Sequence, residues 1–526
     1  MRSPSSAHAR LVLSLLSLFA LACYVGAQTP RSTTSQGELK AAHEFASAQK
    51  QGPLALRAFL AQFPKGADLH VHLSGAVYAE TFIRDAAEDG VCVDTIALKF
   101  VQPPCQGNLV PASDLSGNMT PANQDIYDRL IDAFSMRSFV PTTAYSGHDW
   151  FFATFDRFGG LNKRHVGEWV DEVASRAAAQ NQQYLELMET PAFGHAAQIA
   201  HSIALDPDFA RFRQQLLDKG LRDEVAVDRE HVLSAEARRR ELERCGTPQA
   251  APACKVEIRY IYQVLRAFAP EQVFAQALLG FETVQASMDE HDDTWVGINF
   301  VQPEDGYVSM RDYTLQMKML DYLHSVYPRV HITLHAGELA PGLVPPEGLR
   351  FHIRQAVELG HAERIGHGVD VMYEDDARGL LKEMAQKHIM VEVNLSSNHG
   401  ILGVDGDEHP FSSYRLAHVP VALSTDDEGV SRIDITNEYV RATMEYRLTY
   451  ADLKMLARTG MEHNFLPGAS LWTQPDTFIK MAGACAGDTP GGPRPSNGCK
   501  SLLDGSQKAA AQWEQERRFK AFEAAR

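Results

Sequence analysis

Two histidines near the start of the folded part of the chain have a spacing that suits metal binding. His70 and His72 stand two residues apart in the run Leu-His-Val-His-Leu. If this run is a β-strand, both imidazoles point to one side of it and both can reach a single cation. A His-x-His pair is a weak signal on its own, because most such pairs are incidental. It gains weight when further ligands are brought to the same place.

Three later segments supply such groups, each directly after a β-branched run. His335 is followed by Ala-Gly-Glu, and the small residues allow a sharp turn before Glu338. His367 lies between two glycines, which leave room for an imidazole in a crowded site. Asp426 and Asp427 are adjacent carboxylates, whose mutual repulsion a bound cation would relieve. Imidazoles and carboxylates thus gather in four separate segments, and together they could bind a cation.

The elements that must position these groups alternate as in a parallel α/β fold. Short β-branched runs recur, each followed by a stretch with helical periodicity, and eight such runs predict a (β/α)8 TIM barrel. The four segments then end the first, fifth, sixth and eighth strands, at the edge where barrel enzymes place their chemistry. The predicted strands are Ala67 to Leu73, Tyr184 to Met188, Val256 to Leu265, Trp295 to Val301, Val330 to His335, Ile365 to Val369, Ile389 to Leu395 and Val419 to Ser424.

The spacing of the strands indicates where the barrel carries insertions. From the third strand onward the starts lie roughly 25 to 40 residues apart, the length of one β/α unit, whereas the first two gaps are much longer. We therefore predict a barrel over residues 66–484 with long insertions after strands 1 and 2, at about 90–150 and 205–255. Helical extensions are expected at both ends, an N-terminal one at 28–65 and a disulfide loop with a helix at 485–526.

Composition excludes several classes of partner. The chain has 526 residues, of which 44% are hydrophobic and 22% charged, as in a folded globular protein. Its net charge is −17, so most of its surface repels nucleic acid and anionic membranes. The charged stretch from Asp218 to Arg244 is interpreted as a solvated helical face and not as a nucleic-acid site.

The first 27 residues have the pattern of a secretory signal peptide. Arg2 and Arg10 precede an apolar stretch from Leu11 to Val25, which is shorter than the roughly 20 residues of a membrane-spanning helix. No later segment is long enough to span, so we expect a secreted or periplasmic protein. Cys23 offers the alternative of lipid attachment, although the usual Leu three residues before it is missing.

Six cysteines remain after this peptide, and an even number in an exported chain suggests disulfides. Fifteen connectivities are possible, but local pairing is favoured because each pair of near neighbours brackets a Pro- or Gly-containing segment. Zinc on sulfur is disfavoured because no CxxC spacing occurs. The expected pairs are Cys92 with Cys105, Cys245 with Cys254 and Cys485 with Cys499.

The motifs at the strand ends resemble those of the adenosine deaminase family, within the metal-dependent amidohydrolase superfamily. The resemblance covers roughly residues 64 to 470, and the export signal and early insertions are more similar to the secreted, growth-factor-like branch than to the compact cytosolic enzymes. The matching segments are His70 to Leu73, Tyr184 to Leu187, His335 to Glu338, Arg364 to Gly368, Glu392 to Asn398, Ser424 to Asp427, Leu456 to Arg458 and Phe465 to Pro467.

The resemblance implies a site with one zinc ion per chain and a purine nucleoside as substrate. His367 would orient the attacking hydroxide and take its proton, and Glu338 would protonate the ring nitrogen next to the carbon under attack. Asp427 would hydrogen-bond the imidazole edge of the purine. The implied zinc ligands are His70, His72, His335 and Asp426, of which Asp426 also belongs to the catalytic group.

Several positions depart from the family pattern and concern substrate recognition. Ser74 stands where the compact enzymes have an Asp associated with the ribose hydroxyl. Gln302 stands where the family has a Gly whose backbone faces the purine. An aromatic cluster that includes Trp150 and Phe155 is expected either to form a lid over the base or to pack onto the barrel.

Three functions are compatible with these observations. The first is deamination of adenosine, with deoxyadenosine, outside the cytoplasm. The second is another amidohydrolase reaction on adenine, a modified nucleoside or a non-purine amide, but the segment from Trp295 to Asp305 lacks the Lys of a two-metal centre. The third is a non-catalytic adenosine-binding signalling protein, disfavoured because every ligand, the acid and the base remain. A homo-oligomer is possible, and the sequence does not decide it.

Overall fold

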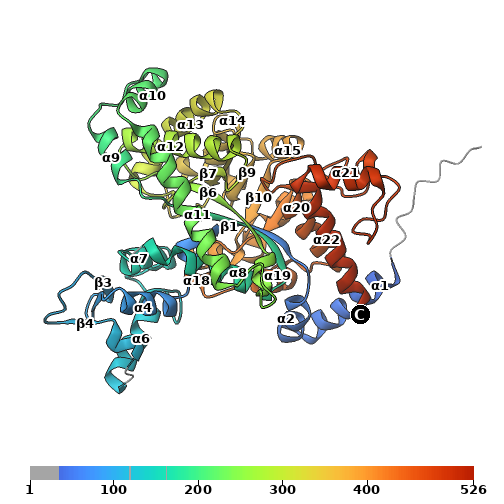
Figure 1. The fold of residues 1–526 in the computed structure, drawn as a ribbon, viewed down its shortest axis with the longest axis horizontal. Coiled ribbons are helices and arrows are strands. Elements are labelled where there is room, and N and C mark those ends of the chain that lie inside the picture. The colour runs from blue at the N-terminus through green and yellow to red at the C-terminus, as the bar shows by residue number, and fades with distance from the viewer. Residues whose placement is uncertain (1–34, 118–119, 162) are drawn as a thin grey trace, which may run out of the picture. The chain divides into compact units, whose positions relative to one another are not determined.

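A parallel sheet closed into a barrel forms the centre of the protein (Figure 1), seen in a computed structural model that describes residues 35–117, 120–161 and 163–526. The predicted signal peptide and Cys23 lie outside these residues. Eight strands neighbour one another in chain order, and the last returns to the first through hydrogen bonds from Asp426 N to His70 O at 2.9 Å and from His72 N to Asp426 O at 3.2 Å. The predicted (β/α)8 TIM barrel is confirmed. Its strands are β1 (Gly66–His72), β5 (Gln182–Glu189), β6 (Glu257–Leu265), β7 (Trp295–Val301), β8 (His331–Ala336), β9 (Arg364–His367), β10 (Met390–Val393) and β11 (Val421–Leu423).

Each of the eight predicted strands overlaps an observed one. The bounds of β7 agree with the prediction, and the ends of the others are displaced by at most a few residues. Strands β5 and β7 are buried along their whole length. Parallel strands that are covered on both faces favour apolar residues, which holds for β7, whereas β5 also buries Glu186 and Glu189.

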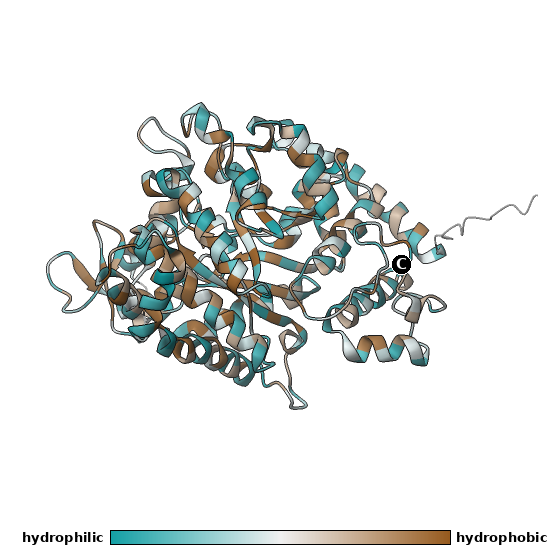
Figure 2. Ribbon diagram, turned by 90° about the horizontal axis from the view of Figure 1, so that it is seen from above, coloured by the Kyte–Doolittle hydropathy of each residue, from teal (hydrophilic) through white to brown (hydrophobic). Residues whose placement is uncertain are grey.

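Amphipathic helices surround the sheet. Helix α12 packs on β6 and β7, and α20 packs on β11 and β1 across the closure. The helices carry apolar and polar residues side by side in Figure 2, as expected when one face is buried and the other meets water. Helix α20 begins at a capping box formed by Thr449 and Asp452. The helices of the barrel region are α3 (Leu73–Ala76), α4 (Ala79–Glu88), α7 (Gly147–Phe158), α8 (Val166–Ala179), α12 (Pro270–Asp289), α13 (Tyr307–Val326), α14 (His352–Glu358), α15 (Ala377–Lys387), α16 (Leu395–Leu402), α17 (Phe411–Leu416), α18 (Glu428–Ser431), α19 (Ile435–Tyr446) and α20 (Tyr450–Glu462).

The long connection after β1 contains a small antiparallel sheet. Its strands β2 (Cys92–Asp94), β3 (Lys99–Val101) and β4 (Leu109–Pro111) pair in the order β3-β2-β4. The disulfide between Cys92 and Cys105 closes this sheet, and helices α5 (Ser113–Gly117) and α6 (Pro121–Ala133) follow it. Phe100 and Phe134 join the insertion to the main core, with their rings 5.0 Å apart.

The connection after β5 is divided differently from the prediction. It contains α9 (Gly194–His201), α10 (Phe209–Asp218) and α11 (Glu224–Leu242), and α11 packs between α8 and α12. Helix α11 therefore belongs to the outer ring of the barrel, because the hydroxyls of Tyr260 and Tyr262 on β6 bond to its Glu236 and Asp228 at 2.9 Å. The predicted insertion at about 205–255 thus contains α10 and α11, whereas α9 precedes it.

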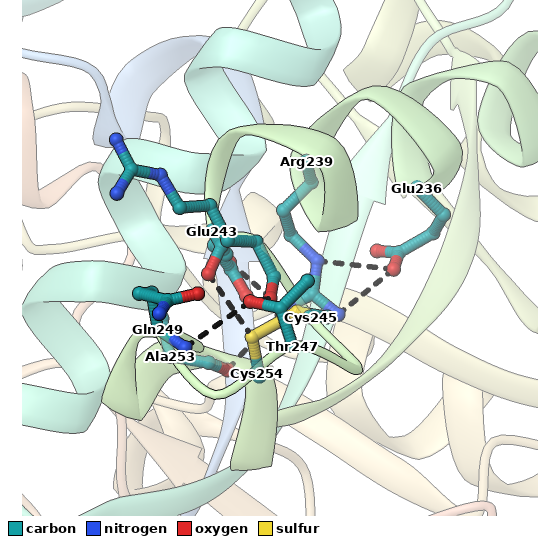
Figure 3. Close-up of a disulfide and its surroundings, with 9 residues drawn as sticks. Glu236, Arg239, Glu243, Cys245, Thr247, Gln249, Ala253 and Cys254 are labelled. Carbon is teal, nitrogen blue, oxygen red and sulfur yellow. Dashed lines mark hydrogen bonds and ion pairs between the residues drawn. A yellow bond between two sulfur atoms is a disulfide. The ribbon is translucent and has the colours of Figure 1, made fainter.

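The charged stretch around α11 is not a wholly solvated face. Arg239 is only 3% exposed and is bonded to Glu236 and Glu243, beside the disulfide between Cys245 and Cys254 (Figure 3). Two carboxylates on the same helix neutralise this buried guanidinium, which a count of charges along the sequence does not reveal.

The terminal extensions pack together at the amino end of the barrel strands. Helices α1 (Gln36–Gln51) and α22 (Gln507–Ala524) contact each other and α20, while α2 (Pro53–Ala61) and α21 (Asn497–Gly505) flank them. Gln515 on α22 donates to Pro64 O just before β1, and Arg518 donates to Gln182 O at the start of β5. The extensions therefore stabilise the end of the barrel opposite its carboxyl edge. Within the described ranges, no helix combines the length and the apolar character needed to cross a membrane.

The structure joins the six cysteines in the three local pairs that the spacing favoured, the third being Cys485 with Cys499. We expect peptide mapping of the unreduced protein to recover these three linked pairs and no free thiol among them. A link between cysteines of different pairs would contradict the assignment, as would thiols that all react with an alkylating reagent before reduction. Reduced protein serves as the control for complete labelling.

Candidate active site

The carboxyl ends of β1, β8, β9 and β11 meet at a cavity of about 560 Å³. The predicted metal ligands and the predicted acid, base and purine-binding carboxylate all lie at this edge of the barrel. All of them except His70, which is buried beneath the cavity floor, line the cavity wall. The four sequence segments therefore converge, as the barrel geometry requires.

The candidate ligand atoms lie close together. Nε2 of His72 is 3.1 Å from Nε2 of His335 and 3.3 Å from Oδ1 of Asp426. Nε2 of His70 is 3.4 Å from the same Asp426 oxygen. Ligand atoms of a tetrahedral zinc ion at 2.0–2.1 Å stand about 3.3 Å apart, so this arrangement fits a cation of that size. The donor atoms of His70, His335, His367 and Asp426 all lie within 4.8 Å of one another, with Nε2 of His367 at 3.9 Å from Asp426 Oδ2. His72 groups instead with Asp426 and Asp427, and it reaches the other ligands through its contacts with His335 and Asp426.

The orientation of each imidazole is set by a second partner. In all three proposed histidine ligands, Nδ1 faces a side-chain oxygen that accepts a hydrogen bond. The proton therefore resides on Nδ1, and the lone pair of Nε2 points into the cluster. The pairs are His70 with Glu392 at 2.6 Å, His72 with Gln263 at 2.9 Å and His335 with Asn299 at 2.9 Å.

Two buried polar atoms of the proposed ligands lack a hydrogen-bond partner in the part of the chain that the structure describes. They are Nε2 of His70 and Oδ1 of Asp426. Burial lowers the pKa of His70, but the carboxylates of Asp426 and Glu392 outweigh it and raise the pKa to about 10. The site therefore attracts a positive charge. Three imidazole nitrogens and one carboxylate are a donor set that suits zinc, so the residues present fit the metal.

Glycines make room for this crowding. A Cβ on Gly366 would lie 2.6 Å from Cε1 of His70, and a Cβ on Gly75 would lie 1.5 Å from Oδ1 of Asp427. Neither position tolerates a side chain. Gly366, the glycine before His367, therefore leaves space for the imidazole of His70. It also gives the local backbone more conformational freedom.

Glu338 is the candidate acid. Its side chain is buried and faces the cavity, with Oε1 at 3.7 Å from Nδ1 of His367. Burial raises the pKa of Glu338 well above its usual value, and the neighbouring carboxylates of Asp426 and Glu304 add to the effect. A raised pKa favours the protonated carboxyl group, which is the form that donates a proton.

His367 is held as a neutral imidazole. Its Nδ1 bonds to Oδ1 of Asn398 at 2.8 Å, and the amide of Asn398 is fixed in turn by His409 at 2.8 Å. Burial lowers the pKa of His367 to about 4. Its Nε2 has no partner among the described residues, so it is free to accept a proton or a hydrogen bond in the cavity.

Asp427 lies beside the cavity and differs from Asp426 in its protonation. Burial, together with the charge of Asp426, raises the pKa of Asp427 to about 8. The pKa of Asp426 is held well below its usual range because, despite burial, His70 and His72 lie against its carboxylate. Adjacent carboxylates with opposite shifts suit different roles, one for a cation and one for hydrogen bonding.

The predicted substrate-contact residues divide into two groups. Ser74, Gln302 and Phe155 line the cavity, whereas Trp150 does not. The indole of Trp150 stacks on Phe139 at 5.4 Å and its Nε1 donates to Ser135 O, on the other side of α7. Trp150 therefore packs against the insertion after β1.

Other members of the predicted aromatic cluster also line the cavity. Phe151 and Phe152, with Phe155 at helical spacing, form one face of α7 at the cavity. Sequence reasoning missed Gln263, which lines the cavity from the carboxyl-terminal part of β6. As one of several polar residues in this strand, Gln263 carried no distinct signal.

Gln302 adopts a backbone conformation that glycine favours. Its φ is +89°, a region that non-glycine residues rarely occupy. The Oε1 atom of Gln302 accepts a hydrogen bond from Ala267 N at 2.9 Å, which offsets part of this cost. The cavity wall therefore contains a strained backbone position at the residue where the family resemblance led us to expect a glycine.

Comparisons with known proteins agree with this geometry. The family model for adenosine deaminase matches residues 165–471. An adenosine deaminase of Clostridium perfringens is 33% identical over 135 residues, which are 26% of this chain and 37% of that enzyme. The aligned part thus spans about a third of the length of this relative.

Solved structures share the fold at low sequence identity. The Arabidopsis N6-mAMP deaminase has a TM-score of 0.51 at 20% identity, covering 78% of this chain and 96% of that one. An amidohydrolase of Burkholderia ambifaria with bound Zn has a TM-score of 0.51 at 18% identity, covering 78% and 88%. The barrel and its histidine-carboxylate cluster define a metal-dependent amidohydrolase. The family model covers more than half of the chain, and the chain therefore belongs to the adenosine deaminase family.

Proposed function

We propose that this protein catalyses the hydrolytic deamination of adenosine and deoxyadenosine to the inosine nucleosides and ammonia, with one zinc ion per chain. The observation that carries this proposal is that imidazoles and carboxylates from four strand ends gather around one cavity, together with Glu338 as the candidate acid and His367 as the candidate base. The proposed zinc ligands are His70, His72, His335 and Asp426.

Each residue of the cavity then has a defined task. Bound zinc supplies a Lewis acid that makes water a nucleophile near neutral pH. Glu338 donates its proton to the ring nitrogen beside the amino-bearing carbon, which makes that carbon more electrophilic. His367, neutral and directed by Asn398, accepts a proton from the attacking water and orients it. Asp427 hydrogen-bonds the imidazole edge of the purine.

The remaining walls suit an uncharged nucleoside. Phe151, Phe152 and Phe155 present aromatic surface to a base, while Ser74 and Gln263 offer polar groups. Among the described residues, no lysine or arginine lines the cavity. A phosphate dianion would be buried there beside carboxylates without a cationic partner, which is unfavourable.

A substrate comparison tests this proposal. Purified protein is expected to release ammonia from adenosine and deoxyadenosine, and a chelator should abolish the release. For AMP, kcat/KM should be at least about 100-fold lower, because of its unpaired charge. Ammonia release from adenine, a modified nucleoside or a non-purine amide, with none from adenosine, would favour the alternative amidohydrolase function. Adenosine binding without turnover in zinc-loaded protein would favour a binding protein.

We also propose that the protein acts outside the cytoplasm. Three disulfides in a chain of this size support an oxidising compartment. Detection of the protein in the reducing cytoplasm with free thiols would contradict this location.

A further inference from the structure

A buried carboxylate outside the cavity holds the turn that carries Glu338. Glu304 follows β7 and is 1% exposed. Its Oε1 accepts a hydrogen bond from Gly337 N at 3.0 Å, and its Oε2 accepts one from Glu338 N at 2.8 Å. Both oxygens of one side chain are therefore bonded to two consecutive amides of the turn.

Glu304 is itself fixed from behind. Nδ1 of His352 donates to its Oε1, and the ring of Tyr313 stacks on the imidazole of His352 at 3.8 Å. Burial opposes the charge of Glu304, but His352 and the nearby Arg266 lower the pKa of its carboxyl group, so it is ionised. Hydrogen bonds to an ionised acceptor are stronger than those to a neutral one.

The backbone of this turn has few other conformations available to it. Gly337 has a φ of +76°, and a Cβ there would lie 2.4 Å from Oδ1 of Asp370. On its other side, the carbonyl of His335 accepts a hydrogen bond from Arg266 at 2.9 Å. The segment from His335 to Glu338 is thus held at both ends, and Glu304 supplies the bonds nearest to Glu338.

We propose that Glu304 is a positioning residue, which through the backbone amides of Gly337 and Glu338 aims the carboxyl group of Glu338 at the substrate. Glu304 does not line the cavity, so it acts through Glu338 and not by touching substrate. The inference rests on the proposed function, because it gives Glu338 the role of proton donor. A displacement of about 1 Å at a catalytic group costs on the order of 100-fold in rate.

The test uses Glu304→Gln, which keeps the size of the side chain but turns an NH2 group toward one of the two amides. We expect kcat for adenosine to fall by roughly 10- to 100-fold, with KM and zinc content little changed. In a Glu338→Gln background the same substitution should change kcat by less than about threefold, since there is no acid left to aim.

Glu374→Gln is the matched control. Glu374 is also buried, and its Oε1 accepts hydrogen bonds from two consecutive amides, Ile353 N at 2.7 Å and Arg354 N at 3.2 Å, at the start of α14. The Glu374→Gln substitution breaks the same kind of hydrogen bond near the turn that carries Glu338, but not on that turn. We expect this variant to keep the kcat of the parent even where its stability falls equally.

Hydrogen exchange measures the positioning without any reaction. Exchange of the amides in residues 336–339 should quicken at least about tenfold in Glu304→Gln and stay at the parental rate in Glu374→Gln. Parental kcat in Glu304→Gln, or losses that multiply with those of Glu338→Gln, would overturn the catalytic role. Unchanged exchange would overturn the positioning itself. If the parent releases no ammonia from adenosine, the proposed function fails, and exchange alone still decides whether Glu304 holds this turn.

Discussion

His335→Ala is expected to abolish bound zinc in a protein that remains folded. Its Nε2 lies 3.1 Å from that of His72, so its removal takes away a donor atom from the middle of the cluster. Zinc content should fall from about one per chain to below about 0.1, because a structural or catalytic zinc site rarely survives the loss of a ligand. Turnover should fall at least about 10⁴-fold, since the metal activates the water.

His331→Ala is the control for this prediction. His331 stands at the other end of β8 and pairs with Glu363 at 2.8 Å, far from the cavity edge of the same strand. It should keep full zinc content and activity. Metal analysis that finds one zinc per chain in folded His335→Ala would remove His335 from the ligand set. If that variant does not fold, His335→Gln preserves side-chain bulk and allows the same measurement.

The barrel and the site could be predicted together because one geometric rule connects them. Buried parallel strands require nearly continuous apolar runs, and the carboxyl ends of those strands meet at one edge. Once eight runs were located, the barrel geometry alone predicted that His70, His335, His367 and Asp426 converge. The positions of the helices were not needed for this prediction. Each strand end was a weak signal alone, and the signal became strong because four of them fell at the same edge of the predicted barrel.

The groups that orient the ligands had no such signal. Gln263 is one of several polar residues in β6, and Asn299 is the single polar residue of β7. Only their contacts with His72 and His335 distinguish them from residues of the same type elsewhere. Glu304 likewise lies in a polar loop beside Asp305, and its sequence position does not show which of the two carboxylates is buried. Their roles depend on register between strands that are distant in sequence, which local patterns do not contain.

Helix rotation explains the difference between Trp150 and its neighbours. The aromatic cluster on α7 includes three consecutive residues, Trp150 to Phe152, which point in different directions around the helix. Its composition therefore identifies a packed helix but not the side that faces the cavity. Docking of α7 directs Phe151 and Phe155 inward and places Trp150 against Phe139 and Ser135. The buried Arg239 on α11 has the same origin, because tertiary packing decides which charge is covered.

Glu338→Gln is expected to separate proton donation from metal binding. The amide keeps the shape of the side chain, and the backbone bond from Glu338 N to Glu304 at 2.8 Å remains, so the turn should stay in place. An amide cannot supply a proton to the ring nitrogen. General acid catalysis is typically worth about 10² to 10⁴ in rate, or roughly 3 to 5 kcal/mol of barrier, and kcat should fall by that amount.

Substrate affinity and zinc content are the internal controls, because neither needs the proton of Glu338. Both should change little, and Glu347→Gln, an exposed substitution in the loop that follows, should behave as the parent in every assay. A folded, zinc-loaded Glu338→Gln that deaminates adenosine within a few-fold of the parent would show that the proton comes from elsewhere. The remaining candidate would then be Asp427, whose raised pKa of about 8 leaves it protonated at neutral pH in the same cavity.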